Sequence, residues 1–423
     1  MSMPSLPALT LAAAALFSMS PAGASTSPAP ENLDLETMWQ LLQAQQAEIA
    51  ALKAELRETR DDVDDTRDKV VITEEQLSAT ADYLDQVEAT RSSSATHIGG
   101  YGEMHYNNLE TDAGEDIKEV DYHRFVLFFN HDFNDRLRFV SELELEHSLA
   151  GDGAPGEVEL EQAYVEYDLN ENHYARTGLF LLPVGILNET HEPPTFYGVE
   201  RNDVENIIIP TTWWEGGAGV GGRYGNGLSW DFAVHSGLEM PTDGSSAFRV
   251  RSGRQKVAEA LADDLAWTAR VKYTGVPGLE LAASYQYQQD ASQLARDGLD
   301  EGELVSVHGI WTRGPFSLRG LWAEWNFDGD LVELADADKQ TGWYVEPSVR
   351  LNLAGTDWGF YTRYEDLEGA RLQDRFDQWE LGFNFYPHPN VVLKADWRNR
   401  DHDLASESGR DFKGFDLGVG YQF

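Results

Sequence analysis

From Thr96 to its last residue, the chain alternates between short runs with an apolar residue at every second position and polar connections. Because side chains along a strand point alternately to the two faces of a sheet, each run has one apolar and one polar face. The connections follow a regular rhythm, in which a tight turn containing Gly, Pro or Asn is followed by a longer polar loop. Short turns at one end and longer loops at the other are typical of outer-membrane barrels, and the rhythm counts out to about sixteen strands.

The apolar faces of the later runs carry aromatic residues near their ends, as in residues 267–273, 379–385 and 415–423. Aromatic side chains gather at both membrane interfaces of transmembrane barrels. A soluble β-sandwich also alternates, but it explains neither the loop rhythm nor a chain that ends on an apolar, aromatic strand. We therefore predict an all-β transmembrane barrel of antiparallel strands over residues 96–423.

The overall composition agrees with a barrel and excludes other classes. The chain has 423 residues, a formal charge of −41 and a mean hydropathy of −0.45. A barrel exposes only alternate residues to lipid, so its average hydropathy is polar. The excess of acid argues against a nucleic-acid partner, because phosphate binding needs clustered Lys and Arg. The absence of Cys suits an outer-membrane protein without disulfides.

The first residues are similar to an export signal. Residues 9–17 form a short apolar core, and Ala22-Gly23-Ala24 supplies a small-x-small cleavage site, so we expect a signal peptide over residues 1–24. No Lys or Arg precedes the core, which leaves a disordered Ala/Pro-rich leader as the alternative. Residues 25–30 form a short Pro/Ser/Thr linker.

Residues 31–91 carry an unbroken heptad pattern. Its first apolar column is Leu35, Leu42, Ile49, Leu56, Val63, Val70, Leu77 and Leu84. A seven-residue apolar repeat held without a slip predicts a left-handed coiled coil, here a periplasmic oligomerisation rod with peptidoglycan as a further possible partner. The alternative is one amphipathic helix docked on a globular body. We expect a parallel homotrimer because a trimeric barrel would impose that symmetry.

Several short runs resemble a known family. They are Ala163-Tyr164-Val165-Glu166-Tyr167, Arg176-Thr177-Gly178-Leu179-Phe180, Pro183-Val184-Gly185, Glu200-Arg201 and the final Gly420-Tyr421-Gln422-Phe423. The last resembles the strand that the outer-membrane assembly machinery recognises, and the others resemble the phosphate-selective porin O and P family. This resemblance covers roughly residues 96–423. It implies sixteen strands, a trimer and an inward-folded third loop at the constriction.

The long connection 183–212 becomes the third external loop, and we predict that it folds into the barrel and narrows the pore. The candidate constriction residues on this loop are Glu189, His191, Glu192, Glu200, Arg201, Asp203 and Glu205. The candidate pore-lining residues on the strands are Arg124, Arg176, Arg223, Arg270, Lys272, Arg350, Arg363 and Arg398. An acidic loop that faces basic walls would place a transverse field across the pore. The alternative is that these arginines pair with lumen acids such as Glu142, Glu166 and Asp396 and hold the wall together.

These features predict an outer-membrane porin of a Gram-negative bacterium, for passive diffusion of small hydrophilic or ionic solutes. Residues 31–91 hold 16 acids and 6 bases, and the rest of the chain holds 57 acids and 26 bases. This surplus of acid favours a general or weakly cation-preferring pore, because a phosphate selector needs a dense basic ladder unopposed by carboxylates. An anion- or phosphate-selective channel and a structural tether to the cell wall are the alternatives. A surface adhesin is disfavoured by the shortness of the external loops.

Other charged groups and motifs have simpler interpretations. We expect the basic cluster Arg249, Arg251, Arg254 and Lys256 in the fourth external loop to be an exposed patch that binds lipid phosphates or a neighbouring molecule. We expect external acids to hold divalent cations that bridge lipopolysaccharide.

The sequence gives no sign of an enzyme. It contains no Gly-x-Ser-x-Gly, no His-Glu-x-x-His and no Gly-rich phosphate loop. His147, His191 and His235 lack metal-ligand spacing. We therefore expect no enzyme activity, no cofactor and no metal site.

Overall fold

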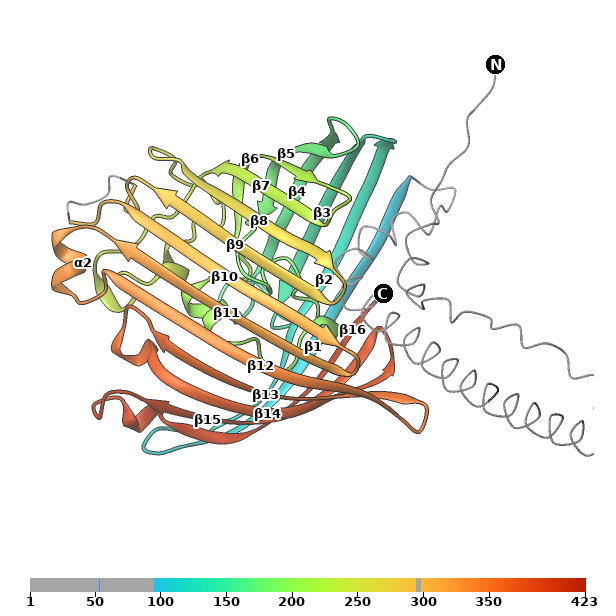
Figure 1. Ribbon diagram of the computed structural model, residues 1–423. Coiled ribbons are helices and arrows are strands. Elements are labelled where there is room, and N and C mark those ends of the chain that lie inside the picture. The colour runs from blue at the N-terminus through green and yellow to red at the C-terminus, as the bar shows by residue number, and fades with distance from the viewer. Residues whose placement is uncertain (1–52, 54–94, 294–297) are drawn as a thin grey trace, which may run out of the picture. The chain divides into compact units, whose positions relative to one another are not determined.

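The computed structural model describes residue 53 and residues 95–293 and 298–423 (Figure 1). The predicted signal peptide (1–24), the linker (25–30) and, apart from Lys53, the predicted coiled coil (31–91) lie outside the described residues. Within the described part of the chain, no helix is long and apolar enough to span a bilayer.

Sixteen antiparallel strands close into a barrel, which confirms the predicted fold of the β region (Figure 1). The strands are β1 (Thr96–Thr111), β2 (Ile117–Asn134), β3 (Leu137–Glu146), β4 (Val158–Asp168), β5 (His173–Leu181), β6 (Trp214–Arg223), β7 (Leu228–His235), β8 (Ala266–Val276), β9 (Leu279–Gln288), β10 (Gly302–Arg313), β11 (Phe316–Phe327), β12 (Lys339–Leu353), β13 (Thr356–Glu368), β14 (Arg375–His388), β15 (Val391–His402) and β16 (Phe412–Gln422).

The described helices are single turns in the long connections. They are η1 (Pro193–Thr195), η2 (Val204–Ile208), η3 (Gly244–Ser246), η4 (Val250–Gly253), α2 (Asp330–Leu334), η5 (Leu372–Asp374) and η6 (Ser408–Arg410). Both η1 and η2 lie in the connection between β5 and β6, which is the predicted third loop. The short turns all lie at one end of the barrel and the long connections at the other, as the rhythm of the sequence predicted.

The first and last strands seal the barrel. The N–H of Gly100 donates to the carbonyl of Phe423 at 2.9 Å, and the N–H of Phe423 donates to the carbonyl of Gly100 at 2.8 Å. Closure satisfies the backbone groups that an open sheet edge would expose to hydrocarbon. The last residue of the chain therefore completes the hydrogen-bond ladder.

The alternation of the strands sorts side chains to the two surfaces as predicted. On the outer surface, Val271, Trp379 and Leu381 are half or more exposed, while the inward Thr268 and Asn384 are fully buried. Apolar groups on the outside of a closed barrel are in contact with lipid, which is the environment that such residues require.

Apolar side chains also fill the interior of the barrel near its long connections. Trp213, Ile208 and Trp325 are fully buried in one cluster that combines the third loop with the neighbouring strand ends. The indole Nε1 of Trp325 donates to the carbonyl of Ile208 at 2.9 Å. Burying one such side chain contributes about 1.5–3 kcal/mol, so the third loop is packed in place and not free in solvent.

Candidate pore constriction

The third loop leaves the barrel wall and returns to it at one place. The N–H of Leu182 donates to the carbonyl of Trp213 at 3.0 Å. The side-chain NH2 of Asn188 donates to the carbonyls of Leu182 and Trp213, at 2.8 and 3.0 Å. The side-chain oxygen of Asn188 accepts from the N–H of Trp213 at 2.6 Å. The two ends of the loop are thus bonded together, and the residues between them form a closed excursion into the lumen.

A buried carboxylate holds the interior of this loop together. Oε1 of Glu205 accepts from the N–H groups of Ile186 and Leu187, at 2.6 and 2.7 Å. Oε2 accepts from the Tyr344 hydroxyl of the wall at 2.9 Å. The adjacent Gly185 has φ +72°, and a Cβ there would lie 2.5 Å from Oε1 of Glu205. Glu205, predicted from the sequence as a constriction residue, therefore lies inside the loop and joins its two arms.

Replacing Glu205 with Ala is expected to loosen the third loop. The change leaves two buried N–H groups without acceptors, and each unpaired group costs about 1–3 kcal/mol. Limited proteolysis of the refolded protein should therefore cut faster between residues 183 and 212, and hydrogen exchange of the Ile186 and Leu187 amides should speed up. The matched control is Glu171→Ala in an exposed short turn. Equal cleavage and exchange rates in the two variants would contradict this role.

Side chains of the opposite barrel wall form hydrogen bonds with the backbone in the middle of the third loop. The carbonyls of Thr195, Phe196, Tyr197 and Gly198 accept hydrogen bonds from Arg319, Asn384, Arg363 and Lys394, respectively. The N–H of Val199 donates to Asp396 at 2.7 Å. These partners lie on β11 and on β13 to β15, opposite the strands from which the loop departs. The loop therefore crosses the lumen, as the sequence predicted.

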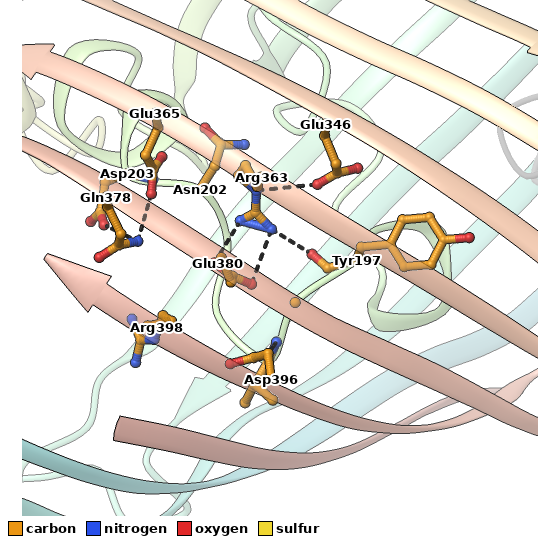
Figure 2. A network of polar contacts seen from close by, with 12 residues as sticks. Tyr197, Asn202, Asp203, Glu346, Arg363, Glu365, Gln378, Glu380, Asp396 and Arg398 are labelled. Atoms are coloured by element: carbon orange, nitrogen blue, oxygen red, sulfur yellow. Dashed lines mark hydrogen bonds and ion pairs between the residues drawn. The ribbon is translucent and has the colours of Figure 1, made fainter. Parts of the chain in front are cut away.

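Three of the predicted pore-lining arginines form hydrogen bonds within the barrel wall or between the wall and the third loop. Arg363 is fully buried, donates to Glu346 and Glu380 at 3.1 and 3.3 Å, and binds the carbonyl of Tyr197 at 2.9 Å (Figure 2).

The other two are Arg124 and Arg398. Arg124 binds Glu103 and the His191 carbonyl, both at 2.6 Å, and Arg398 binds Asp416 at 2.6 Å. At these three positions the arginines pair with acids of the barrel wall, which is the alternative to pore lining that the sequence left open.

Acids of the loop bind wall bases directly. Glu189 pairs with Arg270, which also binds Asp231 at 2.7 Å, and Asp203 pairs with Arg400. The charges of Glu189 and Asp203 are therefore compensated by direct ion pairs, and these acids are not separated from the wall bases by a water-filled pore.

Glu200 accepts from Nδ1 of His105 and from the amide of Asn107, both at 3.1 Å. Burial raises the pKa of Glu200, but the charge and hydrogen bond of His105, together with the charges of His123 and Arg398, lower that pKa below its ordinary value.

The remaining loop candidates have different surroundings. The imidazole of His191 is buried, with Nε2 at 3.3 Å from Oε1 of Glu142. Glu192 lines the cavity beneath the loop. Arg201 is half-buried, and its Nε has no described hydrogen-bond partner.

Beneath the loop, at the end with the short turns, the lumen contains a cavity of about 1120 Å³. We call this cavity the vestibule. Its wall includes the loop residues Glu189 and Glu192, and it reaches the turn residues Pro389 and Asn390. The basic residues along it are Arg138, Arg176, Arg223, Arg270, Lys272, Arg319 and Arg350.

Three of these vestibule cations, Arg176, Arg223 and Lys272, form no ion pair with any described carboxylate. The Arg176 guanidinium lies over the Phe180 ring, 4.4 Å from its centroid, and that of Arg223 lies 4.8 Å from the Tyr174 ring. Arg223 and Lys272 both pair across the sheet with Ser229, so they lie at one level of the wall. By contrast, Arg138 binds Glu166 at 3.1 Å and Arg350 binds Asp357 at 3.3 Å.

The prediction for the fourth loop was wrong. Arg251 and Arg254 are half-buried and donate to the carbonyls of Thr211 and Thr212, where the third loop returns to the wall. Lys256 pairs with Glu157 and Glu159 of the second loop and β4. The cluster is not an exposed patch, because the third loop offers unpaired carbonyls that attract these donors.

The geometry defines a class of protein. Sixteen strands with an apolar, aromatic outer surface, short turns at one end and a third loop folded into the lumen are the features of an outer-membrane porin, which is a channel rather than an enzyme. The chain belongs to the phosphate-selective porin O and P family, whose model matches residues 98–423.

Comparison with individual proteins agrees. An uncharacterised protein of Aquifex aeolicus (strain VF5) is 32% identical over 343 residues, which make up 72% of this chain and 76% of that protein. The anion-selective porin of Comamonas acidovorans matches in fold with a TM-score of 0.56 and 13% identity, over 78% of this chain and all of that one. The channel DcaP of Acinetobacter baumannii matches with a TM-score of 0.53 and 14% identity, over 78% of this chain and 97% of that one.

Proposed function

We propose that this porin is a narrow diffusion channel for small hydrophilic and ionic solutes, constricted by the third loop. The observation that carries the proposal is the packed loop above a charged vestibule. Solutes that pass must fit beside a loop that is fastened on both sides, so pore width limits their size. Liposomes containing the protein should therefore swell quickly in small sugars and progressively more slowly in larger ones. Equal rates for all sugars would argue against a constriction.

A preference for small anions is a second candidate, favoured by Arg176, Arg223 and Lys272. The net charge of the chain predicted weak cation preference instead. However, most acids that line the vestibule are paired, such as Glu166 with Arg138 and Glu189 with Arg270. The three cations that face the same space lack described carboxylate partners, and an uncompensated charge in a narrow lumen attracts its counterion. A reversal potential of the anion-preferring sign in a KCl gradient is expected, and the opposite sign would support the expectation from net charge.

We further propose a homotrimer held by a coiled coil of residues 31–91 in the periplasm, with the rod in reach of peptidoglycan. The heptad pattern supports the rod, and the acidic external connections support binding of divalent cations next to lipopolysaccharide. A tether with an occluded barrel is the alternative to a conducting trimer.

Deleting residues 31–91 is expected to convert the trimer into monomers that retain a folded barrel. In this proposal, the packing of apolar heptad residues between the helices of the coiled coil supplies the free energy of association. Light scattering of the detergent complex after size exclusion measures the oligomer, and heat-modifiable migration in gels checks that the barrel is folded. A trimer that persists without these residues would show that the rod provides spacing and not oligomerisation.

A further inference from the structure

A cluster of two histidines and one aspartate lies near the end of the barrel that carries the long connections. Asp121 and His123 come from β2, and His147 is the first residue after β3. One ligand atom from each lies within 4.8 Å of the other two. Nδ1 of His147 is 2.8 Å, and Nδ1 of His123 is 3.3 Å, from Oδ2 of Asp121. The side chains are 24–36% exposed, so water and ions can reach them.

A β-bulge in β2 lies between Asp121 and Arg124 and turns His123 to the same face as both of them. Glu103 pairs with Arg124 and His105 pairs with Asp121, so β2 has one residue more than β1 over this stretch. A bulge redirects a side chain that strict alternation would send to the opposite face. His123 accordingly stacks on the inward-facing His105, with ring centroids 4.8 Å apart. Regular alternation from the inward-facing Arg124 would have turned the neighbouring His123 to the outer face.

The third member is placed by its backbone. The N–H of His147 donates to the carbonyl of His123 at 3.1 Å, and His147 and Ser148 have φ values of +50° and +52°. Non-glycine residues rarely adopt this left-handed conformation, and it is concentrated at functional sites. The chain thus turns sharply at the point where the His147 imidazole meets Asp121.

The surrounding groups hold the cluster in orientation. His105, stacked on His123, is itself bonded to Glu200 of the third loop at 3.1 Å and lies 3.4 Å from Glu103. Outer contacts of this kind fix the ring planes of metal ligands. Because Glu200 belongs to the third loop, the same contacts connect the cluster to the constriction.

We propose that Asp121, His123 and His147 form a binding site for a divalent transition-metal ion, such as Zn²⁺, inside the external mouth of the porin. Two imidazole nitrogens and one carboxylate oxygen are a common protein ligand set for such ions, and solvent supplies the remaining positions. The hard cations Mg²⁺ and Ca²⁺ prefer all-oxygen sites, so the two nitrogens discriminate against them. The spacing of these histidines in the sequence gave no sign of the site, because its ligands come from two segments that the pairing of β2 with β3 brings together.

The test is calorimetric titration of the purified full chain with ZnCl₂. The wild-type protein should bind Zn²⁺ at a tight site, and the double variant His123→Ala/His147→Ala should weaken that site by at least about tenfold, in line with the loss of first ligands. The single variant Asp121→Asn keeps a polar side chain in the bulge and should also weaken Zn²⁺ binding. The control is His173→Ala, at the first residue of β5 and at the opposite end of the barrel, where the ring contacts Tyr224.

The outcomes separate the proposal from its competitors. Heat-modifiable migration first establishes that each variant is folded. Loss of the tight site in the double variant and in Asp121→Asn, with His173→Ala unchanged, supports the proposal. Equal Zn²⁺ affinity in wild type and double variant overturns it, as does displacement of Zn²⁺ by equimolar CaCl₂, which would indicate general binding to the acidic surface. None of these results depends on whether the pore conducts.

Discussion

Removing the third loop is expected to raise the single-channel conductance on the order of threefold, because pore width at the constriction limits ion flow through a water-filled barrel. The variant replaces residues 184–211 with Gly-Gly. The join is feasible because Leu182 and Trp213 are already bonded to each other at 3.0 Å. The deletion takes away the backbone that Arg363 and Asp396 fasten across the lumen. Recordings in planar bilayers measure the change directly.

The matched control for this deletion is removal of residues 151–154 from the second external loop. This segment is exposed for most of its length, and neither Gly151 nor Gly153 has an atom near the position of an added Cβ. Its removal should leave the conductance unchanged. If both deletions leave the conductance at the wild-type value while gels show folded barrels, the third loop is not the constriction.

The second large effect is expected from the three vestibule cations. Replacing Arg176, Arg223 and Lys272 together with Gln should lower the anion-to-cation permeability ratio by at least about fivefold, since even one of these charges, at roughly 15 Å and an effective dielectric constant of ~20, contributes about 1 kcal/mol. Reversal potentials in a salt gradient report this ratio. The effect should shrink at high salt, where charges in the lumen are screened.

A control with the same change in net charge is Lys118→Gln, Lys339→Gln and Arg410→Gln. These three side chains are exposed near the long connections and do not line the vestibule. Exposed charges are screened by solvent, so the permeability ratio should move little. If the two triple variants shift the reversal potential equally, selectivity depends on net charge and not on the vestibule.

Alternation in the sequence predicted which side chains enter the lumen, because strand geometry assigns faces with period two. Arg270, Arg363 and Arg398 are buried on the inner face, and Val271 and Trp379 are exposed on the outer one. Alternation carries no information on which inward groups meet, since partners come from strands far apart in sequence. The pairing of Arg363 with Glu346 and Glu380, for example, depends on the register of β12, β13 and β14.

Irregular segments were predicted less well, for a physical reason. The bulge in β2 adds one residue to an otherwise regular run, and no residue there signals it. The role of Glu205 depends on a chain path through η2 that brings its carboxylate to the amides of Ile186 and Leu187. The arginines of the fourth loop looked solvent-exposed because their acceptors are backbone carbonyls, which every sequence contains.

The most direct test of the central claim is single-channel recording of the purified full chain in planar lipid bilayers. A porin whose lumen holds water beside a fastened loop should insert and produce discrete, stable current steps of uniform size. A protein that is folded and inserted in the membrane, as judged by heat-modifiable migration and co-flotation with liposomes, yet passes no current would contradict a diffusion channel and support an occluded tether.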